Sequence, residues 1–418
     1  MEQKKAIEHG QGPLLIVAGA GTGKTTVLKE RFKYLVNSGK AKPEEILCLV
    51  FNEDAAAHLE DKIIEENTDW AYCDLWIQTF HAFCDKILRR HCFDIGLADD
   101  FKILSDNQGW ILMRKNLDKF DFKHYQSLGN PAKFLDQLSY HFKECKEEGI
   151  YPEHYLEYAD SLRVDLTDNG AKAGDDLDVM REEMEKAAEV ARAYAMYQKT
   201  LLDNNSLDFG DQLNYCLKLF KKSPATLKIY RDKFKYILVD EFQDTNRIQY
   251  ELVKILAAPK NNLSVVGDDD QSIYRFRGAV LENVLDFCHD FPEAKIVVLK
   301  TNYRSTQSIL DWAYKSIVNN NPNRLEHYVA HKKEVADNFL KQQIRLEELK
   351  RLCADSGQVG AFEVWQCQDV EEEARRVVQK IKELQKCFTP NKSPQDLEYP
   401  DFAILARTNA QAQKICSV

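Results

Sequence analysis

The sequence lacks the features that mark a membrane, secreted or zinc-cluster protein. No apolar run approaches the ~18 residues that a membrane span requires, and the opening segment MEQKKAIEHG has no apolar stretch behind its lysines, so no signal peptide is predicted. The 11 cysteines occur singly, without a C-x-x-C pair, which indicates reduced thiols rather than disulfides or a zinc site. These absences predict a cytoplasmic protein without a membrane partner.

Positive charge is also in short supply. The chain of 418 residues has 57 Lys+Arg against 67 Asp+Glu, for a formal net charge of −10. This balance argues against a protein that holds nucleic acid through general basicity, so a nucleic-acid site would have to be a local groove. With 44% hydrophobic and 30% charged residues, the composition is that of a soluble globular protein with about two or three domains.

Short β-rich runs alternate with helical stretches over residues 1–90. This alternation is typical of βαβ units with a parallel sheet. It stops over residues 91–205, where long runs rich in Lys, Glu, Leu, Tyr and Ala predict a helical insertion. The charged segment from Asn323 to Cys353 predicts one or two solvated helices. The predicted strands are LLIVA, ILCLVF, LWIQTF, YILVD, LSVVGD, KIVVLK, AFEVWQC and FAILAR.

The stretch VAGAGTGKTT follows the phosphate-binding P-loop rule, except that Ala18 stands where the rule has its first glycine. Its glycines let backbone N–H groups turn inward around phosphate oxygens, and the following helix adds the positive end of its dipole. Lys24 would then reach the β- and γ-phosphates, and the Thr25 hydroxyl would bind magnesium. A glycine-rich turn without a ligand is the alternative, but the predicted strand before it and helix after it favour the P-loop.

A second candidate element is YILVDEFQDTN, in which an apolar strand ends at Asp240 and Glu241. A carboxylate at a strand end can hold magnesium, and an adjacent glutamate can orient and deprotonate an attacking water. An isolated Asp-Glu pair would more often cap a loop. Its occurrence together with a P-loop favours the catalytic interpretation.

The stretch VVGDDDQSIYRFRGA places three aspartates side by side at a strand end. Such a cluster is costly to fold unless cations or hydrogen-bond donors relieve it, so it indicates a site. Gln271 is suited to sensing a γ-phosphate, while Tyr274, Phe276 and Arg277 combine planar faces with positive charge, as base stacking requires. Taken alone, these aromatic residues would more often belong to a core.

The stretch LKTNYRST follows another predicted strand. Tyr303 offers a face for an adenine ring, and Arg304 offers a positive fork for the γ-phosphate, as an arginine finger supplied by a second domain. A Tyr-Arg pair at a strand end is unremarkable when it stands alone.

The order of these blocks resembles that of superfamily 1 DNA helicases of the UvrD/Rep/PcrA type. QKKAI resembles the Q motif, AGAGTGKT motif I, VFNEDAA motif Ia and TFHAFC motif Ib. VDEFQDTN, VVGDDDQSIYRFRGA and NYRST resemble motifs II, III and IV. YQKTLLDNNSLDFGDQL resembles the turn after the family's helical insertion, and FAILARTNAQAQ the strand that re-enters its second motor domain.

The resemblance implies an α/β fold built on a RecA-like P-loop NTPase with a parallel sheet. A first RecA-like domain would cover residues 1–90 and 206–292, a helical insertion residues 91–205, and an incomplete second RecA-like domain residues 293–418. It implies an enzyme that uses ATP and Mg²⁺ to move along single-stranded DNA, usually 3′ to 5′, and to act at junctions of single- and double-stranded DNA. The sequence points to no protein partner.

The resemblance also implies a role for each matching residue. Gln3 and Tyr303 would hold adenine, while Thr25 and Asp240 would hold magnesium. Glu241 would activate water, and Gln271 and Arg304 would contact the γ-phosphate. The phosphates would lie on the loop formed by Ala18, Gly19, Ala20, Gly21, Thr22, Gly23, Lys24, Thr25 and Thr26. The DNA track would be lined by Phe80, His81, Tyr274, Phe276 and Arg277.

Several positions depart from the family pattern. Phe276 replaces the usual tryptophan of motif III, and in motif Ia Asn52, Glu53 and Asp54 replace Thr, Asn and Lys. No motif V or VI is found, so we expect a fragment that binds ATP but unwinds little duplex alone. A nucleotide-binding scaffold without motor activity, or a segment of a larger helicase-nuclease, are the alternatives.

Overall fold

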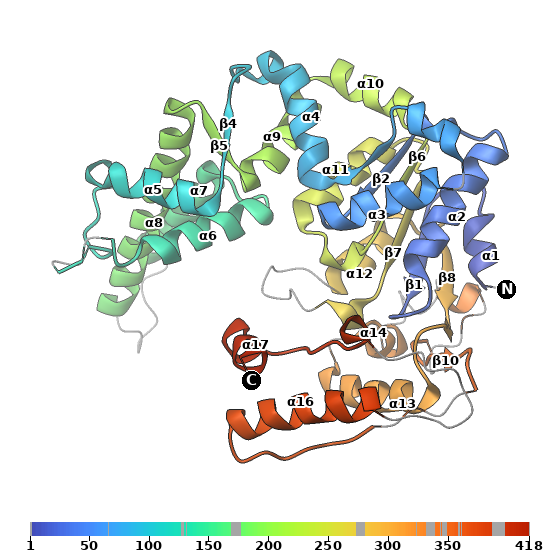
Figure 1. Cartoon of the computed structure of the whole chain (residues 1–418). Helices are drawn as coiled ribbons and strands as arrows, with labels where there is room; N and C mark the ends of the chain where they lie inside the picture. Colours follow the sequence, from blue (N-terminus) through green and yellow to red (C-terminus); the bar gives the residue numbers. More distant parts are fainter. Residues whose placement is uncertain are drawn as a thin grey trace. The chain divides into compact units, whose positions relative to one another are not determined.

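A computed structural model of the chain contains two compact units, residues 1–359 and residues 360–418 (Figure 1). The elements below are taken from the part of the chain that the structure describes. That part comprises residues 2–65, 67–126, 129–130, 132–168, 177–272, 281–322, 324–331, 339–342, 344, 349–357, 360, 362–386 and 398–417.

A six-stranded parallel sheet forms the centre of the first unit, with the strand order β3-β2-β6-β7-β1-β8. Every residue of β1, β2, β6 and β7 is buried, which is why these strands appear in the sequence as unbroken apolar runs. The six corresponding sequence predictions are confirmed. The strands are β1 (Leu14–Ala18), β2 (Ile46–Val50), β3 (Trp76–Thr79), β6 (Tyr236–Val239), β7 (Leu263–Gly267) and β8 (Lys295–Leu299).

Helices cover both faces of this sheet (Figure 1). Successive residues of β1 alternate between the two hydrophobic cores, with Leu15 and Val17 in one and Leu14 and Ile16 in the other. On one face pack α1 (Glu2–Ile7), α2 (Lys24–Asn37) and α3 (Glu53–Ile64). On the other pack α4 (Phe80–His91), α9 (Phe209–Lys222), α10 (Pro224–Lys233), α11 (Arg247–Ala257) and α12 (Leu281–Asp290).

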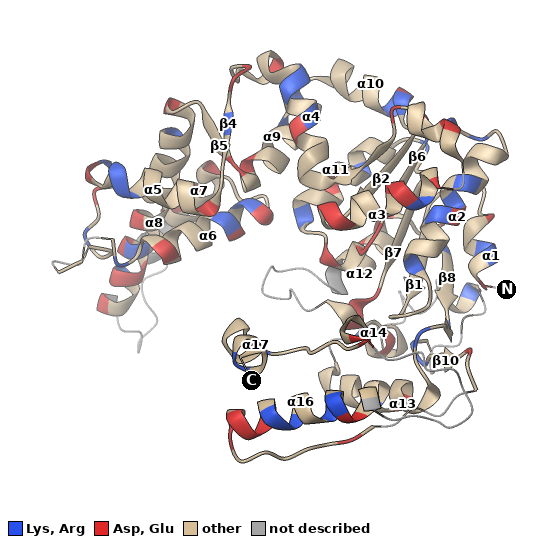
Figure 2. Cartoon of the chain, viewed as in Figure 1, with Lys and Arg blue, Asp and Glu red and all other residues tan. Residues whose placement is uncertain are grey.

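The helices predicted between residues 91 and 205 are present, and they bury a core of their own. They are α5 (Asp106–Lys115), α6 (Leu135–Glu147), α7 (Pro152–Asp168) and α8 (Leu177–Asp203). A short parallel ladder of β4 (Lys102–Leu104) and β5 (Ser206–Asp208) closes the insertion where the chain leaves and returns. Blue and red residues are interspersed on α5, α6 and α8 in Figure 2, so these helices present no continuous basic stripe in that view.

The segment predicted as solvated helices, Asn323 to Cys353, is instead partly buried in the first unit. The helix α14 (Leu325–His331) is present, but its Leu325 and Val329 belong to the large core on one face of the sheet. Arg324 and Lys350 are also buried. The prediction of full solvation was wrong because the charges on this segment have buried partners of opposite sign.

Strand β8 begins at Lys295, inside the range predicted for the second domain, yet it pairs with β1 of the first sheet. The second unit contains α16 (Val370–Lys386) and α17 (Asn409–Cys416), where Gln411 Nε2 donates to Glu373 Oε1 at 3.3 Å. The two strands predicted there, AFEVWQC and FAILAR, are not strands in the described residues. A strand requires a partner for its backbone hydrogen bonds, and neither segment has one in that part of the chain.

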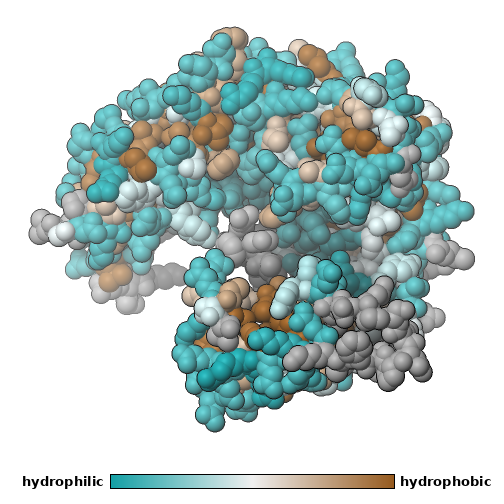
Figure 3. All heavy atoms as spheres, in the orientation of Figure 1, coloured by the Kyte–Doolittle hydropathy of each residue, from teal (hydrophilic) through white to brown (hydrophobic). Residues whose placement is uncertain are grey.

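None of the helices in the described ranges has the length and apolarity that crossing a membrane would require. On the face drawn in Figure 3, hydrophilic residues predominate and hydrophobic residues occur in separate patches.

A buried ion cluster joins the insertion to the first domain. Lys146 of α6 places its Nζ 2.7 Å from Asp208 Oδ2 and 2.9 Å from Asp211 Oδ1, at the start of α9. The Tyr197 hydroxyl donates to Asp208 Oδ2 at 3.1 Å. Burial, assisted by the neighbouring Asp208, raises the pKa of Asp211 to about 6. Lys146 therefore neutralises carboxylates that water reaches poorly.

We predict that Lys146→Met lowers the free energy of unfolding by about 3–5 kcal/mol, because it leaves two buried carboxylates without their cation. Urea denaturation followed by circular dichroism measures the change. The matched control is Lys143→Met on the same helix, whose ion pair with Asp106 is exposed, so a loss below about 1 kcal/mol is expected. Equal losses for the two variants would contradict the assignment.

Candidate active site

Four of the sequence motifs lie at the carboxyl edge of the central sheet. The P-loop follows β1, Asp240 and Glu241 follow β6, the aspartate triad follows β7, and Asn302 to Arg304 follow β8. Because these strands are parallel and adjacent, their carboxyl ends meet at one edge of the sheet. Parallel pairing thus brings together residues that are up to about 290 positions apart in the sequence.

The P-loop depends on close backbone approaches that only glycine allows. Gly21 has φ +73°, and a Cβ on it would lie 2.6 Å from Asn302 Nδ2 and 2.8 Å from the Cβ of Arg304. Asn302 is buried and donates from Nδ2 to the Ala20 carbonyl at 2.5 Å. Thr22 closes the loop by donating from Oγ1 to the Gly19 carbonyl at 2.7 Å. Asn302, the residue before Tyr303, therefore supports the P-loop directly.

Lys24 meets two of the predicted catalytic residues. Its Nζ lies 2.5 Å from Glu241 Oε2 and 3.3 Å from Gln271 Oε1. Glu241 adopts a left-handed backbone conformation at φ +45°, and its Oε2 also accepts from Gln243 Nε2 at 2.8 Å. One ammonium group is thus placed between the carboxylate predicted to activate water and the amide predicted to sense phosphate.

Asp240 supplies a buried carboxylate beside this group. Its Oδ1 accepts from the Glu241 N–H at 2.9 Å. Burial, and to a lesser extent the charge of Glu241, raises the pKa of Asp240 to about 6. A carboxylate in such a setting gains from a divalent cation, which favours its ionised form.

The donor set fits a magnesium ion that is shared with phosphate. Within the described residues, no group of three or more His, Cys, Asp or Glu side chains is placed to hold a metal alone. Mg²⁺ commonly binds through one or two carboxylates together with substrate phosphates and water. Asp240 with the Thr25 hydroxyl, at the start of α2, suits that mode of binding.

Gln3 and Tyr303 lie beside the P-loop, as their predicted roles require. Gln3 Nε2 donates to the Thr22 carbonyl at 2.8 Å. The Tyr303 N–H donates to the Gly21 carbonyl at 2.9 Å, while its side chain is 57% exposed. The backbone of Arg304 is fixed by a bond from its N–H to Asn302 Oδ1 at 2.9 Å. Their contacts with adenine and the γ-phosphate stay predictions.

The aspartate triad is neutralised by cations that the sequence analysis did not connect with it. Lys350 Nζ lies 2.5 Å from Asp268 Oδ1 and also contacts Asp269 Oδ1. Arg324 donates from Nε and Nη2 to the two oxygens of Asp270 at 2.7 and 2.9 Å. Burial alone would raise the pKa of Asp268, but Lys350 holds it below its usual value.

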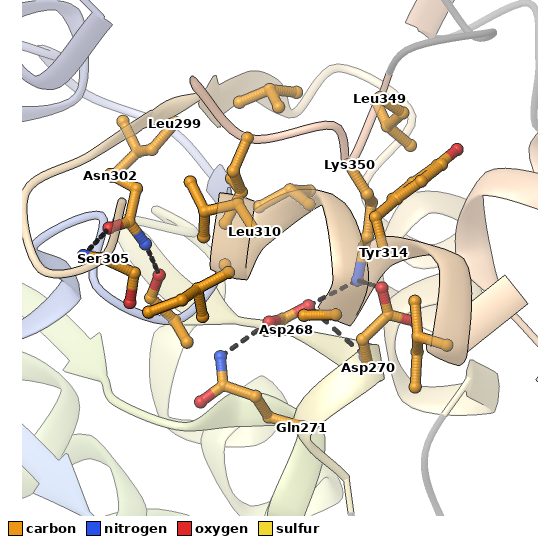
Figure 4. Close-up of a pocket in the computed structure, with 18 residues that line it drawn as sticks. Asp268, Asp270, Gln271, Leu299, Asn302, Ser305, Leu310, Tyr314, Leu349 and Lys350 are labelled. Carbon is orange, nitrogen blue, oxygen red and sulfur yellow. Dashed lines mark hydrogen bonds and ion pairs between the residues drawn. The ribbon is translucent and has the colours of Figure 1, made fainter. Parts of the chain in front are cut away.

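Asp268, Asp270 and Lys350 line a cavity of about 300 Å³ next to the P-loop (Figure 4). Apolar side chains line much of the same cavity, including Leu299, Leu310 and Leu349. Figure 4 shows Lys350 directed at Asp268 and Asp270, with Gln271 bonded to Asp268 from the other side. The helix α13 (Gln307–Ile317) contributes much of the wall.

The predicted DNA-contacting residues separate into three groups. Phe80 is only 4% exposed and belongs to the hydrophobic core, so its burial favours a packing role and does not support stacking on a base. His81 lies at a cavity of about 440 Å³, where its ring meets that of Phe209 edge-on at 5.7 Å. Tyr274, Phe276 and Arg277 lie outside the described residues.

Phe209 is a candidate that the sequence analysis missed. It is 42% exposed at the first position of α9 and lines the same cavity as His81, Asp240 and Glu241. The available signal in the sequence was its position directly after Asp208, the N-cap of α9. An aromatic residue at the first position of a helix can stay outside the buried apolar face of that helix.

Two family comparisons match the chain. The UvrD/REP helicase N-terminal domain matches residues 1–292, and the UvrD-like helicase C-terminal domain matches residues 297–418. The chain is 33% identical to the ATP-dependent DNA helicase PcrA of Leuconostoc citreum over 414 residues, which are 99% of this chain and 47% of that protein. It is 40% identical to the ATP-dependent DNA helicase PcrA of Bacillus subtilis over 329 residues, 77% of this chain and 39% of that protein. The chain spans about half the length of these curated relatives or less.

We predict that Gly21→Ala weakens ATP binding by about tenfold or more, because the left-handed backbone and the contacts with Asn302 and Arg304 each oppose a Cβ. Gly12→Ala is the matched control: its φ is +93°, but nothing lies within 4 Å of an added Cβ. Isothermal titration with ATP measures both variants. A Gly21→Ala protein that binds as tightly as the Gly12→Ala protein would show that the close packing of the loop is unimportant.

Proposed function

The chain belongs to the UvrD/Rep helicase family, and from this membership we propose that it binds ATP with Mg²⁺ and hydrolyses ATP to move along single-stranded DNA. The observation that carries the proposal is the convergence of Lys24, Glu241 and Gln271 within hydrogen-bonding distance. A nucleotide scaffold would have no chemical need for Glu241 and Gln271 at this position.

Each residue around the loop has a distinct task in the proposed reaction. The P-loop N–H groups and Lys24 bind and orient the phosphates, and Glu241 accepts a proton from the attacking water. Gln271 presents its carbonyl to Lys24 and can report the state of the γ-phosphate through that contact. Asp240 and Thr25 would hold Mg²⁺ together with the phosphates, and the bound ion would neutralise the charge that develops on them.

The Glu241 carboxylate is already hydrogen-bonded in this structure. Its Oε2 accepts from both Lys24 and Gln243, so this oxygen is engaged while Lys24 stays in place. Phosphate oxygens bound by Lys24 would compete for that ammonium group and release one hydrogen bond on Glu241. Nucleotide binding and activation of the base are linked in this way.

Arg304 and Tyr303 complete the nucleotide site in the proposal. They follow β8, and the Asn302 contacts hold their backbone against the P-loop. From there Arg304 acts as an arginine finger on the γ-phosphate, and the exposed ring of Tyr303 stacks on adenine. Gln3, on the other side of the loop, holds the adenine edge.

The DNA track in the proposal passes the cavity lined by His81 and Phe209. These two rings offer planar faces for bases, and Lys143 of the insertion lines the same cavity with a positive charge. Asp240 and Glu241 line it as well, so DNA and the hydrolytic residues are neighbours. We propose single-stranded DNA and junctions with duplex as substrates, with 3′ to 5′ movement.

We predict that Glu241→Gln lowers kcat for DNA-stimulated ATP hydrolysis by about 10²–10⁴-fold while ATP still binds, because only the general base is lost. Lys24→Ala is expected to lose binding as well. Steady-state phosphate release and ATP titration measure the two effects. The control is Glu45→Gln, at the opposite edge of the sheet, where Glu45 pairs with Lys235. Binding without turnover in the unaltered chain, with DNA present, would favour a scaffold over a motor.

We predict that Phe209→Ala weakens single-stranded DNA binding by about 5- to 150-fold, the equivalent of ~1–3 kcal/mol for one lost stacking contact. Fluorescence anisotropy with a labelled oligothymidylate measures the affinity. Phe93→Ala is the control, since Phe93 is an exposed phenylalanine that does not line this cavity. Equal effects of the two substitutions would move the DNA track away from Phe209.

A further inference from the structure

We infer that Lys350 is a positioning residue for ATP hydrolysis, which fixes Asp268 so that Asp268 holds the Gln271 amide toward Lys24. The inference rests on the proposed function and deepens it. It assigns a hydrolytic task to a lysine in a segment that no predicted motif includes, and it connects that segment to the ATP site.

The first step is the burial of the triad. Asp268 and Asp269 are almost fully buried, and the side chain of Asp270 is 16% exposed. Adjacent carboxylates that water screens poorly repel one another strongly. Lys350 is only 4% exposed at its side chain and contacts all three, at 2.5 Å from Asp268 and 3.6 Å from Asp270. This one ammonium group therefore offsets negative charge on all three carboxylates.

The second step is that the two carboxylate oxygens of Asp268 bind different partners. Its Oδ1 is bound by Lys350, and its Oδ2 accepts from Gln271 Nε2 at 2.6 Å. Because the Gln271 nitrogen is committed to this carboxylate, its Oε1 must face away, toward Lys24 at 3.3 Å. An amide without that anchor could rotate and turn its N–H group toward the Lys24 ammonium, which repels it.

The third step is the anchoring of Lys350 itself. The backbone N–H of Lys350 donates to Glu326 Oε1 at 3.3 Å, and Glu326 also accepts from the Tyr314 hydroxyl at 3.0 Å. Arg324 binds Asp270, and the Leu325 N–H donates to Asp269 Oδ2 at 2.8 Å. Residues 324–326 thus bind Asp269, Asp270 and the backbone of Lys350, whereas Asp268 receives its positive charge from Lys350.

The surroundings make this chain of contacts effective. Asp268, Asp270 and Lys350 line the same cavity as the apolar residues Leu299, Leu310 and Leu349, next to the P-loop (Figure 4). Charge interactions are stronger where apolar groups exclude water, and each member of a hydrogen-bonded chain fixes its neighbour. The Lys350 ammonium therefore fixes Asp268, Asp268 fixes the Gln271 amide, and that amide contacts Lys24 of the P-loop.

The test compares Lys350→Met with Lys350→Arg in the whole chain. We expect Lys350→Met to lower kcat for DNA-stimulated ATP hydrolysis by about 10- to 100-fold, the usual effect of losing a residue that orients a catalytic group. The Kd for ATP should change less than about threefold, because the P-loop is intact. Lys350→Arg keeps the charge and should recover most of kcat. Lys235→Met, which removes an ion pair with Glu45 at the opposite edge of the sheet, is the matched control.

A second readout does not require hydrolysis. The side-chain amide resonance of Gln271, identified by its loss in Gln271→Glu, should shift in Lys350→Met and return toward its original position in Lys350→Arg. If the unaltered chain hydrolyses ATP and Lys350→Met changes neither kcat nor this resonance, the positioning role is overturned and the proposed function stands. If the unaltered chain binds but does not hydrolyse ATP and the resonance still shifts, the positioning of Gln271 by Lys350 stands and the proposed function fails. A loss of kcat in Lys350→Met that equals its loss of folded protein in a thermal melt would also overturn the inference.

Discussion

The neutralisation of negative charge at one edge of a parallel sheet is the constraint on which this structure depends. Two carboxylates follow β6 and three follow β7; Asp240, Asp268 and Asp269 are buried there, and the other two are partly exposed. Lys24 forms an ion pair with the first group, and Lys350 and Arg324 form ion pairs with the second. The positions of the P-loop helix and of the segment around Arg324 both follow from this requirement.

The same requirement links folding to chemistry. The cations that permit these carboxylates to be buried also hold the hydrogen bonds of Glu241 and Gln271. A reaction that moves charge between phosphate and water therefore takes place inside a network that is already balanced. Altering one cation changes the stability of the sheet edge and the orientation of the catalytic groups together.

The sequence predicted those elements whose signal is local. Apolar runs marked the six strands of the sheet, and the glycines with Lys24 marked the loop. The burial of Phe80 could also have been predicted, because Phe80, Phe83, Cys84 and Ile87 recur at helical spacing and together form one buried face. Phe80 was instead predicted to contact DNA because TFHAFC resembles motif Ib. The role of Lys350 had no local signal, since its partner Asp268 lies 82 residues away and only the tertiary fold joins them.

The strand β8 lies in the range predicted for the second domain, yet it pairs with a strand of the first sheet. It hydrogen-bonds along the whole of β1, from Leu14 with Lys295 to Ala18 with Leu299, and β1 runs directly into the phosphate-binding loop. Past its end, Asn302 holds that loop through the Ala20 carbonyl. A pull on the chain beyond Asn302 is therefore borne in shear by the β1–β8 ladder, and the phosphate-binding loop lies at the loaded end of that ladder.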